Sequence, residues 1–276
     1  MSIAAIIAAG GSSSRMQSEG GGETVKKEYR PLGEGVEDDE GKPLTVLGAA
    51  VGTFAASPRI DRIVIAVPAD TETGEYAARN SLPASLLRTF LKNTPHMTAE
   101  PSFLSGSVDP QTFPPAGAEG PRILFVPGGK TRQFSVYHAL SLLSLYMPDY
   151  VLIHDGARPW VESSLIEAVI GAVLVSGAVI PVLPLIETPK EIGPDNIISR
   201  HLKRSCVATA QTPQAFAFPN ILYAHEKAAE KTLSEGIDYT DDAEIWAEFC
   251  GPVTVIQGSP RNRKITFKED LPSYGA

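Results

Sequence analysis

Cysteine is scarce in this sequence: Cys206 and Cys250 are the only two among 276 residues, and neither belongs to a CxxC pair or a Cys/His cluster. We therefore expect neither a disulfide scaffold nor a structural zinc site, and reduced thiols are typical of a cytoplasmic protein. Basic residues are also outnumbered, with 24 Lys and Arg against 32 Asp and Glu and a net charge of −8. This balance argues against broad nucleic-acid binding, which depends on a surplus of Lys and Arg.

Two apolar stretches bear on export and membrane insertion. The first, MSIAAIIAAG at residues 1–10, has no basic residue before its apolar run, so we interpret it as a buried strand rather than a signal peptide. The second, residues 168–186, is uncharged over nearly the length of a transmembrane helix, but glycines and prolines interrupt it. Helix, turn and strand is the better interpretation, and we expect no membrane partner and a cytoplasmic location.

Short, continuous apolar runs recur along the chain with helical patterns between them. Runs that do not alternate with polar residues are typical of strands buried on both faces, as in a parallel sheet. The predicted strands are residues 3–8, 63–67, 123–126, 151–153, 178–182 and 253–256, and the predicted helices are 44–56, 132–146, 163–175 and 241–249. This order predicts a single α/β domain with a doubly wound, mostly parallel sheet.

Four segments do not fit the alternation of strands and helices. Residues 17–25 and the acidic, glycine-punctuated residues 33–43 are expected to be irregular insertions at the surface. Residues 94–121 contain six prolines and three glycines, which favours a long irregular loop or lid. Residues 183–203 are polar for a segment between two strands, and an arm that reaches away from the sheet explains that composition.

Glycine-rich and charged loops follow the predicted strands, and in open parallel sheets ligands bind outside the carboxyl ends of the strands. In AAGGSSSRM, residues 8–16, small side chains leave backbone N–H groups open to an anion, and Arg15 lies at the rim. In PGGKTRQFS, residues 127–135, two glycines precede a helix that Thr131 is expected to cap. Taken alone, each loop is explained as well by an ordinary turn before a helix.

Among these stretches, HDGARP at residues 154–159 is the most specific indication of a functional site, because a carboxylate follows directly at the end of a predicted buried strand. Asp155 is well placed to hold Mg²⁺, which prefers one or two carboxylates together with substrate phosphates. Arg158 can bind phosphate or pair with Asp155, and a purely structural ion pair is the alternative. With Arg15, Lys27 and Lys264 as further cations, the loops favour phosphoryl or nucleotidyl transfer, in which positioning and charge neutralisation supply most of the catalysis.

The order of the motifs is specific to one family. AAGGSSSRM, KKEY, PGGKTRQFS, HDGARP, ETPK, QTPQAF, YTDDAE and GSPRNRKIT follow one another, from about residue 3 to residue 271, as in 2-C-methyl-D-erythritol 4-phosphate cytidylyltransferases. The resemblance covers nearly the whole chain and implies a Rossmann-like nucleotidyltransferase fold. It also implies transfer of CMP from CTP to 2-C-methyl-D-erythritol 4-phosphate, with release of pyrophosphate, in non-mevalonate isoprenoid synthesis.

The resemblance also implies a role for each matching residue. The cations at the α-phosphate are Arg15, Lys27 and Lys264. The nucleotide-binding positions are Ala8, Ala9, Gly10, Gly11, Gly129, Lys130, Arg132, Ser135, Asp155 and Gly156, of which Gly129, Lys130 and Ser135 meet the cytosine. Asp155 and Asn262 would hold Mg²⁺, the expected cofactor. The sugar phosphate would meet Arg158, Thr188, Arg204 and Thr240, and the arm would clasp a second subunit in a homodimer, so that Thr188 and Arg204 serve the partner's site.

The sequence departs from the family pattern at three of these motifs. The loop GGSSSR is one residue longer than the usual GxGxR, and Glu187 replaces the aspartate of DTxK. Lys26 replaces the usual proline before Lys27, so either lysine can be the catalytic cation. Two alternatives stay open: a cytidylyltransferase for a polyol phosphate such as ribitol 5-phosphate, and a non-catalytic nucleotide-binding dimer.

Overall fold

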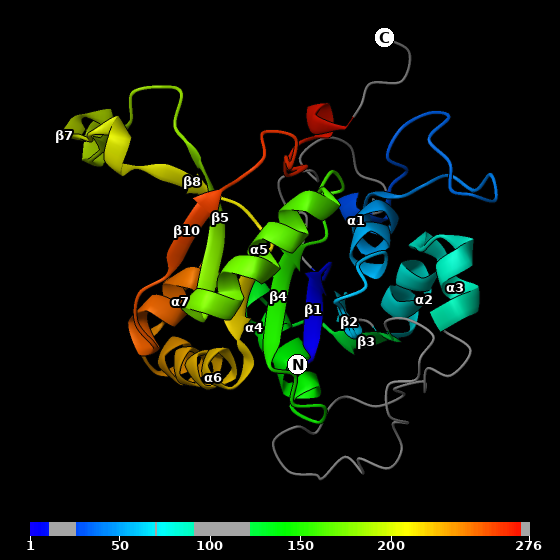
Figure 1. Ribbon diagram of the computed structural model, residues 1–276. Coiled ribbons are helices and arrows are strands. Elements are labelled where there is room, and N and C mark those ends of the chain that lie inside the picture. Colours follow the sequence, from blue (N-terminus) through cyan, green and yellow to red (C-terminus); the bar gives the residue numbers. More distant parts are fainter. Residues whose placement is uncertain (11–25, 70, 91–121, 272–276) are drawn as a thin grey trace.

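The computed structural model describes residues 1–10, 26–69, 71–90 and 122–271, and its centre is a mixed sheet (Figure 1). The strand order is β10-β5-β9-β4-β1-β2-β3, with β8 paired to β5. The strands are β1 (Ile3–Ala8), β2 (Arg62–Val67), β3 (Arg122–Pro127), β4 (Tyr150–Asp155), β5 (Ala178–Pro184), β8 (Ala208–Ala210), β9 (Gln214–Ala217) and β10 (Thr254–Gln257). The six predicted strands are all present, so the prediction of a mostly parallel α/β sheet is confirmed.

The sheet is parallel except at β8, which is antiparallel to β5, and around β9. Strand β1 runs parallel to both β2 and β4, β2 runs parallel to β3, and β5 runs parallel to β10. Strand β9 lies between β4 and β5 and is antiparallel to both. Because β9 runs in the opposite direction, the residues just before it lie at the same sheet edge as the carboxyl end of β4. This strand was not among those predicted from the sequence.

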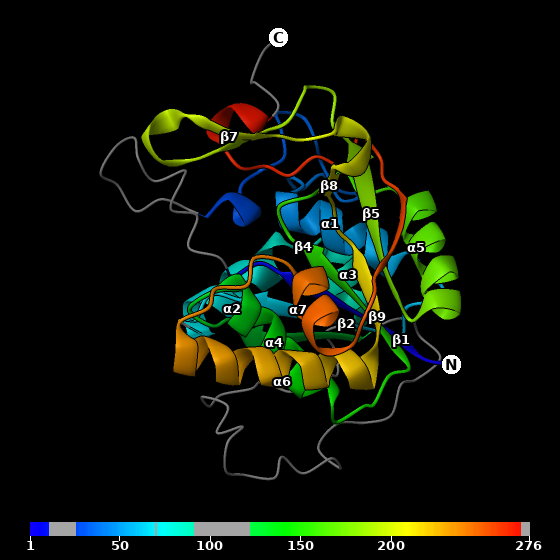
Figure 2. The same cartoon turned by 90° about the vertical axis from the view of Figure 1, so that its left-hand side faces the viewer.

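Helices cover both faces of the sheet and explain the continuous apolar runs. One face packs against α1 (Val46–Ala55), α2 (Thr71–Ser81), α3 (Ala84–Phe90) and α5 (Ser163–Ser176). The other packs against α4 (Arg132–Leu143), α6 (Phe218–Glu235) and α7 (Asp242–Phe249), and Figure 2 shows α5 and α6 on opposite sides. In β1, Ile3, Ala5 and Ile7 enter the first layer, whereas Ala4 and Ile6 enter the second. Successive side chains thus face opposite layers, and both layers exclude water.

The uncharged stretch at residues 168–186 divides as predicted into helix, turn and strand. Helix α5 ends at Ser176, Gly177 adopts the left-handed conformation with φ 76°, and β5 begins at Ala178. A helix capped by a left-handed glycine cannot continue into the next segment. None of the helices in the described ranges is both long enough and apolar enough to cross a membrane.

Residues between β5 and β8 form the arm, which stands away from the main sheet (Figure 1). It carries a separate hairpin of β6 (Lys190–Ile192) and β7 (Ile198–His201), followed by the short 3₁₀ helix η5 (Arg204–Cys206). Strand β5 runs to Pro184, so the first residues of the predicted arm 183–203 still belong to the sheet. The arm exposes four isoleucines, Ile186, Ile192, Ile197 and Ile198.

Of the three predicted insertions, only residues 33–43 lie in the described part of the chain. This segment folds into a compact turn in which the Asp38 carboxylate accepts hydrogen bonds from the backbone N–H groups of Glu40 and Lys42, both at 3.0 Å. Asp38 also accepts the N–H of Ala84 at the start of α3, at 3.1 Å. The insertion is therefore attached to the body of the protein. Residues 17–25 and 94–121 lie outside the described residues.

Candidate active site

The loops after β1 and β3 meet through two glycines. A Cβ atom on Gly10 would lie 2.9 Å from the Val67 carbonyl oxygen and 3.4 Å from Cα of Gly128, and a Cβ on Gly128 would lie 2.8 Å from the same oxygen. Only glycine allows this approach at both positions. The predicted anion-binding residues Ala8, Ala9 and Gly10 therefore lie beside the PGGKT loop, whereas Gly11 and Arg15 lie outside the described residues.

The PGGKT loop is held in shape by the first turn of α4. Thr131 caps the helix as predicted, accepting the N–H of Phe134 at 3.3 Å. The Ser135 hydroxyl accepts the Gly129 N–H at 3.0 Å and donates to the Thr131 carbonyl at 2.9 Å. In this structure Ser135 thus shapes the loop that was predicted to meet the cytosine, and Lys130 lies exposed on it.

Asp155, the last residue of β4, is the centre of the site. Its Oδ1 accepts a hydrogen bond from Arg132 Nε at 2.9 Å, and its Oδ2 lies 2.9 Å from Lys264 Nζ and 3.5 Å from Arg158 Nε. Burial raises the pKa of a carboxyl group, but these three cations together hold the pKa of Asp155 well below its ordinary value. Asp155 is therefore an anion surrounded by positive charge.

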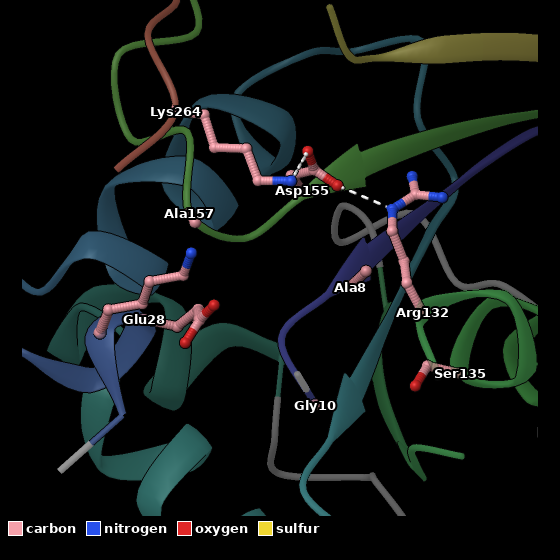
Figure 3. A pocket seen from close by; sticks show the side chains of 9 residues that line it. Ala8, Gly10, Glu28, Arg132, Ser135, Asp155, Ala157 and Lys264 are labelled. Atoms are coloured by element: carbon pink, nitrogen blue, oxygen red, sulfur yellow. Dashed lines mark hydrogen bonds and ion pairs between the residues drawn. The ribbon is translucent and has the colours of Figure 1, made fainter. Parts of the chain in front are cut away.

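Asp155, Arg132 and Lys264 line one cleft at the carboxyl ends of β1 and β4 (Figure 3). Lys264 and Arg132 approach Asp155 from opposite sides in that view. The residues that line the cleft are Ala8, Gly10, Lys27, Glu28, Arg132, Ser135, Asp155, Ala157 and Lys264. Predicted site residues from five separate motifs thus meet in a single cleft, as the rule for ligand binding in parallel sheets requires.

The two candidate lysines of KKEY bond to different loops. Lys27 Nζ donates to the carbonyl of Ile265, next to Lys264, at 2.8 Å, and Lys27 lines the cleft. Lys26 Nζ donates to the Gly10 carbonyl at 3.2 Å, and burial lowers the pKa of Lys26. The geometry therefore favours Lys27 as the partner of Lys264, with Lys26 supporting the loop after β1.

Arg158 and Asn262 join the HDGARP turn to the NRKIT segment. Arg158 donates to the backbone carbonyl of Asn262 at 2.8 Å, and the Ile265 N–H bonds to the Ala157 carbonyl at 2.8 Å. The Asn262 side-chain amide donates to the Thr212 carbonyl at 2.7 Å, which fixes its orientation. Its Oδ1 is buried and has no hydrogen-bond partner, so one acceptor remains for a donor or a cation.

Arg132 reaches a second carboxylate that the sequence analysis missed. Its Nη2 lies 2.8 Å from Oδ2 of Asp242, the first residue of α7, and His225 Nε2 lies 3.3 Å from the other oxygen. Asp242 and His225 are fully buried. Arg132 was predicted as a nucleotide-binding residue, and here it connects Asp155 to this buried pair. The repeated aspartate of YTDD was the available signal for Asp242.

None of the four residues predicted to bind the sugar phosphate, Arg158, Thr188, Arg204 and Thr240, is among those that line this cleft. Thr240 is exposed just before α7, and its N–H bonds to Glu244 at 3.3 Å. Thr188 is exposed in the arm, and Arg204 donates to the Ile186 carbonyl, also in the arm, at 2.8 Å. Both residues belong to the arm, which stands away from the main sheet (Figure 1).

The donor set limits the metal that this site can hold. No group of three or more His, Cys, Asp or Glu side chains in the described residues has the arrangement of a metal centre. A single buried carboxylate and a buried amide oxygen suit a hard cation that takes its remaining ligands from water and phosphate, as Mg²⁺ does. Asp155 and Asn262 thus fit the predicted ion in their chemistry.

Comparisons with known proteins identify similar chains. The model of the family "2-C-methyl-D-erythritol 4-phosphate cytidylyltransferase" matches residues 109–275, which is more than half of the chain. A bifunctional enzyme IspD/IspF from Bartonella tribocorum is 32% identical over 272 residues, covering 98% of this chain and 55% of that protein. A protein of the same description from Mesorhizobium japonicum is 31% identical, covering 98% and 53%. The chain therefore spans about half the length of these relatives.

Solved structures share the overall fold of this chain. The 4-diphosphocytidyl-2C-methyl-D-erythritol synthase from Anaerococcus prevotii superposes with a TM-score of 0.67 at 25% identity, covering 98% of this chain and 92% of that one. The bifunctional IspDF from Campylobacter jejuni gives a TM-score of 0.61 at 22% identity, covering 98% and 53%. The second likeness bears on the fold alone.

Proposed function

This chain belongs to the 2-C-methyl-D-erythritol 4-phosphate cytidylyltransferase family, and we propose on that basis that it transfers CMP from CTP to 2-C-methyl-D-erythritol 4-phosphate. The products are 4-diphosphocytidyl-2-C-methyl-D-erythritol and pyrophosphate. The observation that carries the proposal is the cleft in which Asp155 is surrounded by Lys264, Arg132 and Arg158, next to Lys27. Preorganised cations of this kind stabilise the charge that develops on a phosphate during transfer.

In the proposed reaction, an oxygen of the substrate 4-phosphate attacks the α-phosphorus of CTP. The new P–O bond forms as the bond to the β-phosphate oxygen breaks, and pyrophosphate leaves with the electron pair. No general base is needed, because the attacking phosphate is already ionised near neutral pH. Lys27 and Lys264 are the cations that would hold the pentavalent α-phosphate, together with Arg15 by family resemblance.

Mg²⁺ belongs to the proposal as a cofactor, which would neutralise charge on the triphosphate. Asp155 and Asn262 Oδ1 are the residues that would hold it. Of the three cations on Asp155, Lys264 has the most exposed side chain, at 40% against 25% for Arg132 and 11% for Arg158. Lys264 is therefore the cation that would leave the carboxylate for the phosphate when nucleotide and metal bind.

A homodimer through the arm is part of the same proposal. The side chains of Ile186 and Ile197 are 84% and 65% exposed, and apolar surface of that kind is typical of an interface. The arm of one subunit would then bring Thr188 and Arg204 to the sugar phosphate in the partner's cleft. The reduced thiols Cys206 and Cys250 fit a cytoplasmic location, which we also propose.

Pyrophosphate release by the purified protein tests the function directly. The protein is supplied with Mg²⁺ and CTP, and methylerythritol phosphate is compared with ribitol 5-phosphate in parallel. We expect release with methylerythritol phosphate. Release with ribitol 5-phosphate alone would keep the nucleotide site but replace the substrate, and no release with either would favour a non-catalytic nucleotide-binding protein.

A further inference from the structure

His154, the residue before Asp155 in β4, lies completely buried beneath the cleft. Its ring packs against Phe54 of α1, with the ring centroids 4.9 Å apart. The family motifs and the proposed reaction give this ring no task, although both of its nitrogens have partners.

The hydrogen bonds around the ring allow one tautomer. The Asp155 N–H donates to Thr212 Oγ1 at 3.1 Å, and Oγ1 also lies 3.0 Å from His154 Nδ1. His154 Nε2 lies 3.1 Å from the Arg158 carbonyl oxygen, which can only accept a hydrogen bond, so an imidazole with a single ring proton must carry it on Nε2. Nδ1 then accepts the Thr212 hydroxyl proton, and every partner in the set is satisfied.

Both ends of this network reach charged groups of the site. Through Thr212, the ring fixes the backbone N–H of Asp155, and Thr212 in turn receives the side-chain amide of Asn262. Through its other nitrogen, the ring fixes the carbonyl of Arg158, whose side chain pairs with Asp155. Asp155 contacts both residues through its main chain, with its N–H bonded to Thr212 Oγ1 and its carbonyl to the Arg158 N–H, and His154 adds a second, side-chain bridge between Thr212 and the Arg158 carbonyl.

We propose that His154 is a positioning residue, which as the Nε2–H tautomer holds the turn from Asp155 to Arg158 and the Thr212 hydroxyl in the arrangement that the cleft requires. The inference rests on the proposed function and adds a residue that does not touch the substrate. Displacing reacting groups by about 1 Å can cost a hundredfold in rate, so a residue of this kind affects turnover from outside the cleft.

The first measurement is the ¹⁵N NMR signature of the His154 ring in protein carrying ¹⁵N-labelled histidine, assigned by its loss in His154→Gln. We expect one tautomer, with Nε2 protonated and Nδ1 unprotonated. A ring protonated at Nδ1, or a mixture of tautomers, overturns the inference. This measurement needs no substrate, so it judges the network even if the proposed function fails in the pyrophosphate assay.

The second measurement compares turnover in three variants with wild-type protein. His154→Leu removes both hydrogen bonds, and we expect kcat to fall at least about tenfold, with the KM for CTP changing much less. His154→Gln restores a donor near the Arg158 carbonyl and should recover part of kcat. Phe54→Leu loosens the packing around the ring without removing a hydrogen bond, so it serves as the control.

The comparison is made between variants of similar thermal stability. If Phe54→Leu lowers kcat as much as His154→Leu, the effect is one of packing and the inference is overturned. If His154→Leu does not fold, His154→Gln is compared with Phe54→Leu instead. A Gln variant that is less active than the packing control supports the inference, because Gln cannot satisfy both partners, and one that is equally active overturns it.

Discussion

Lys264 Nζ lies 2.9 Å from Oδ2 of Asp155, so a cation proposed to act on the phosphate and the carboxylate proposed to hold the metal are paired with each other. Arg132 binds the other carboxylate oxygen at 2.9 Å and is more buried than Lys264. Loss of Lys264 therefore leaves Asp155 neutralised by arginine. Lys264, which is proposed to act on the phosphate, can therefore be tested separately from Arg132, which connects Asp155 to the buried Asp242.

Lys264→Met should accordingly lower activity much more than stability. We expect turnover to fall about a hundredfold, roughly 3 kcal/mol of transition-state stabilisation, as for loss of one preorganised donor. The free energy of unfolding should change by less than about 1 kcal/mol, because the pair is partly exposed to water. Pyrophosphate release and urea unfolding measure the two quantities, and near-normal turnover would remove Lys264 from the mechanism.

Lys227→Met is the matched control for that variant. Lys227 also has a side chain that is 40% exposed, and it forms a 2.8 Å ion pair with Glu230 on α6, away from the cleft. We expect both turnover and stability to remain close to wild type. A loss of turnover equal to that of Lys264→Met would show that the assay responds to any missing surface lysine.

The two lysines of KKEY should differ in their effects. Lys27→Ala should lower turnover about a hundredfold, since Lys27 lines the cleft beside the segment that carries Lys264. Lys26→Ala removes a hydrogen bond to the Gly10 carbonyl and should have the smaller effect. Single-turnover kinetics at saturating CTP distinguish them, and the reverse ranking would make Lys26 the catalytic cation.

Asp242→Asn should destabilise the protein in a pH-dependent way. Burial raises the pKa of Asp242, but Arg132 and His225 outweigh burial and lower it below the ordinary value of 3.8. At neutral pH the ionised carboxylate stabilises the fold, and breaking this buried pair should cost about 3 kcal/mol. As the pH falls below the ordinary pKa, the unfolded chain takes up the proton first, so wild-type protein loses this advantage.

Urea unfolding of wild-type protein and Asp242→Asn at several pH values tests that expectation. The difference in stability should be largest near neutral pH and should narrow as the pH falls below about 4. Glu230→Gln is the control, because it removes an exposed carboxylate that is paired with Lys227. Its free energy of unfolding should differ little from that of wild-type protein at every pH tested. A difference for Asp242→Asn that does not change with pH would contradict the assigned charge.

Mixing two inactive variants tests whether the arm serves a second subunit. Lys27→Ala damages the cleft and Arg204→Ala damages the arm, so each homodimer should lose most of its activity. In a hybrid dimer, one cleft receives both defects and the other receives neither. Random exchange of subunits should therefore restore roughly a quarter of wild-type activity. No recovery, with dimers verified by sedimentation, would mean that the arm serves its own chain.

The sequence predicted the elements whose signal is local. Strands such as residues 3–8 are continuous apolar runs because both faces are buried. That pattern can be recognised in the sequence without knowing which strands lie beside it in the sheet. Strand β9 has four residues, and its pairing between β4 and β5 depends on segments distant along the chain. Helix α6 was missed although Phe218, Ile221, Ala224 and Ala228 are buried at helical spacing, so its signal was present.

The residues of the site also fall into two groups, those that sequence patterns identify and those that only the fold reveals. Asp155, Lys27 and Lys264 could be named because they lie in loops at strand ends or in family motifs, and the structure brings them to one cleft. Asp242 and His154 were not named although they stand in the motifs YTDDAE and HDGARP, because their contacts with Arg132 and Thr212 join residues far apart in the sequence. A buried polar residue needs partners, and a sequence without its fold does not identify them.

The arm begins and ends at the main sheet, because β8 and β9 both run antiparallel to β5, the strand from which the arm leaves. The chain leaves at the end of β5, returns through β8 along that same strand, and passes Gln211 and Thr212 before it enters β9. Gln211 bonds to Ser259 and Asn262, so this return path is fastened beside the NRKIT segment. The arm can therefore gain or lose residues between these anchors without shifting a strand, which leaves its outer part open to evolutionary change while the anchors stay constrained.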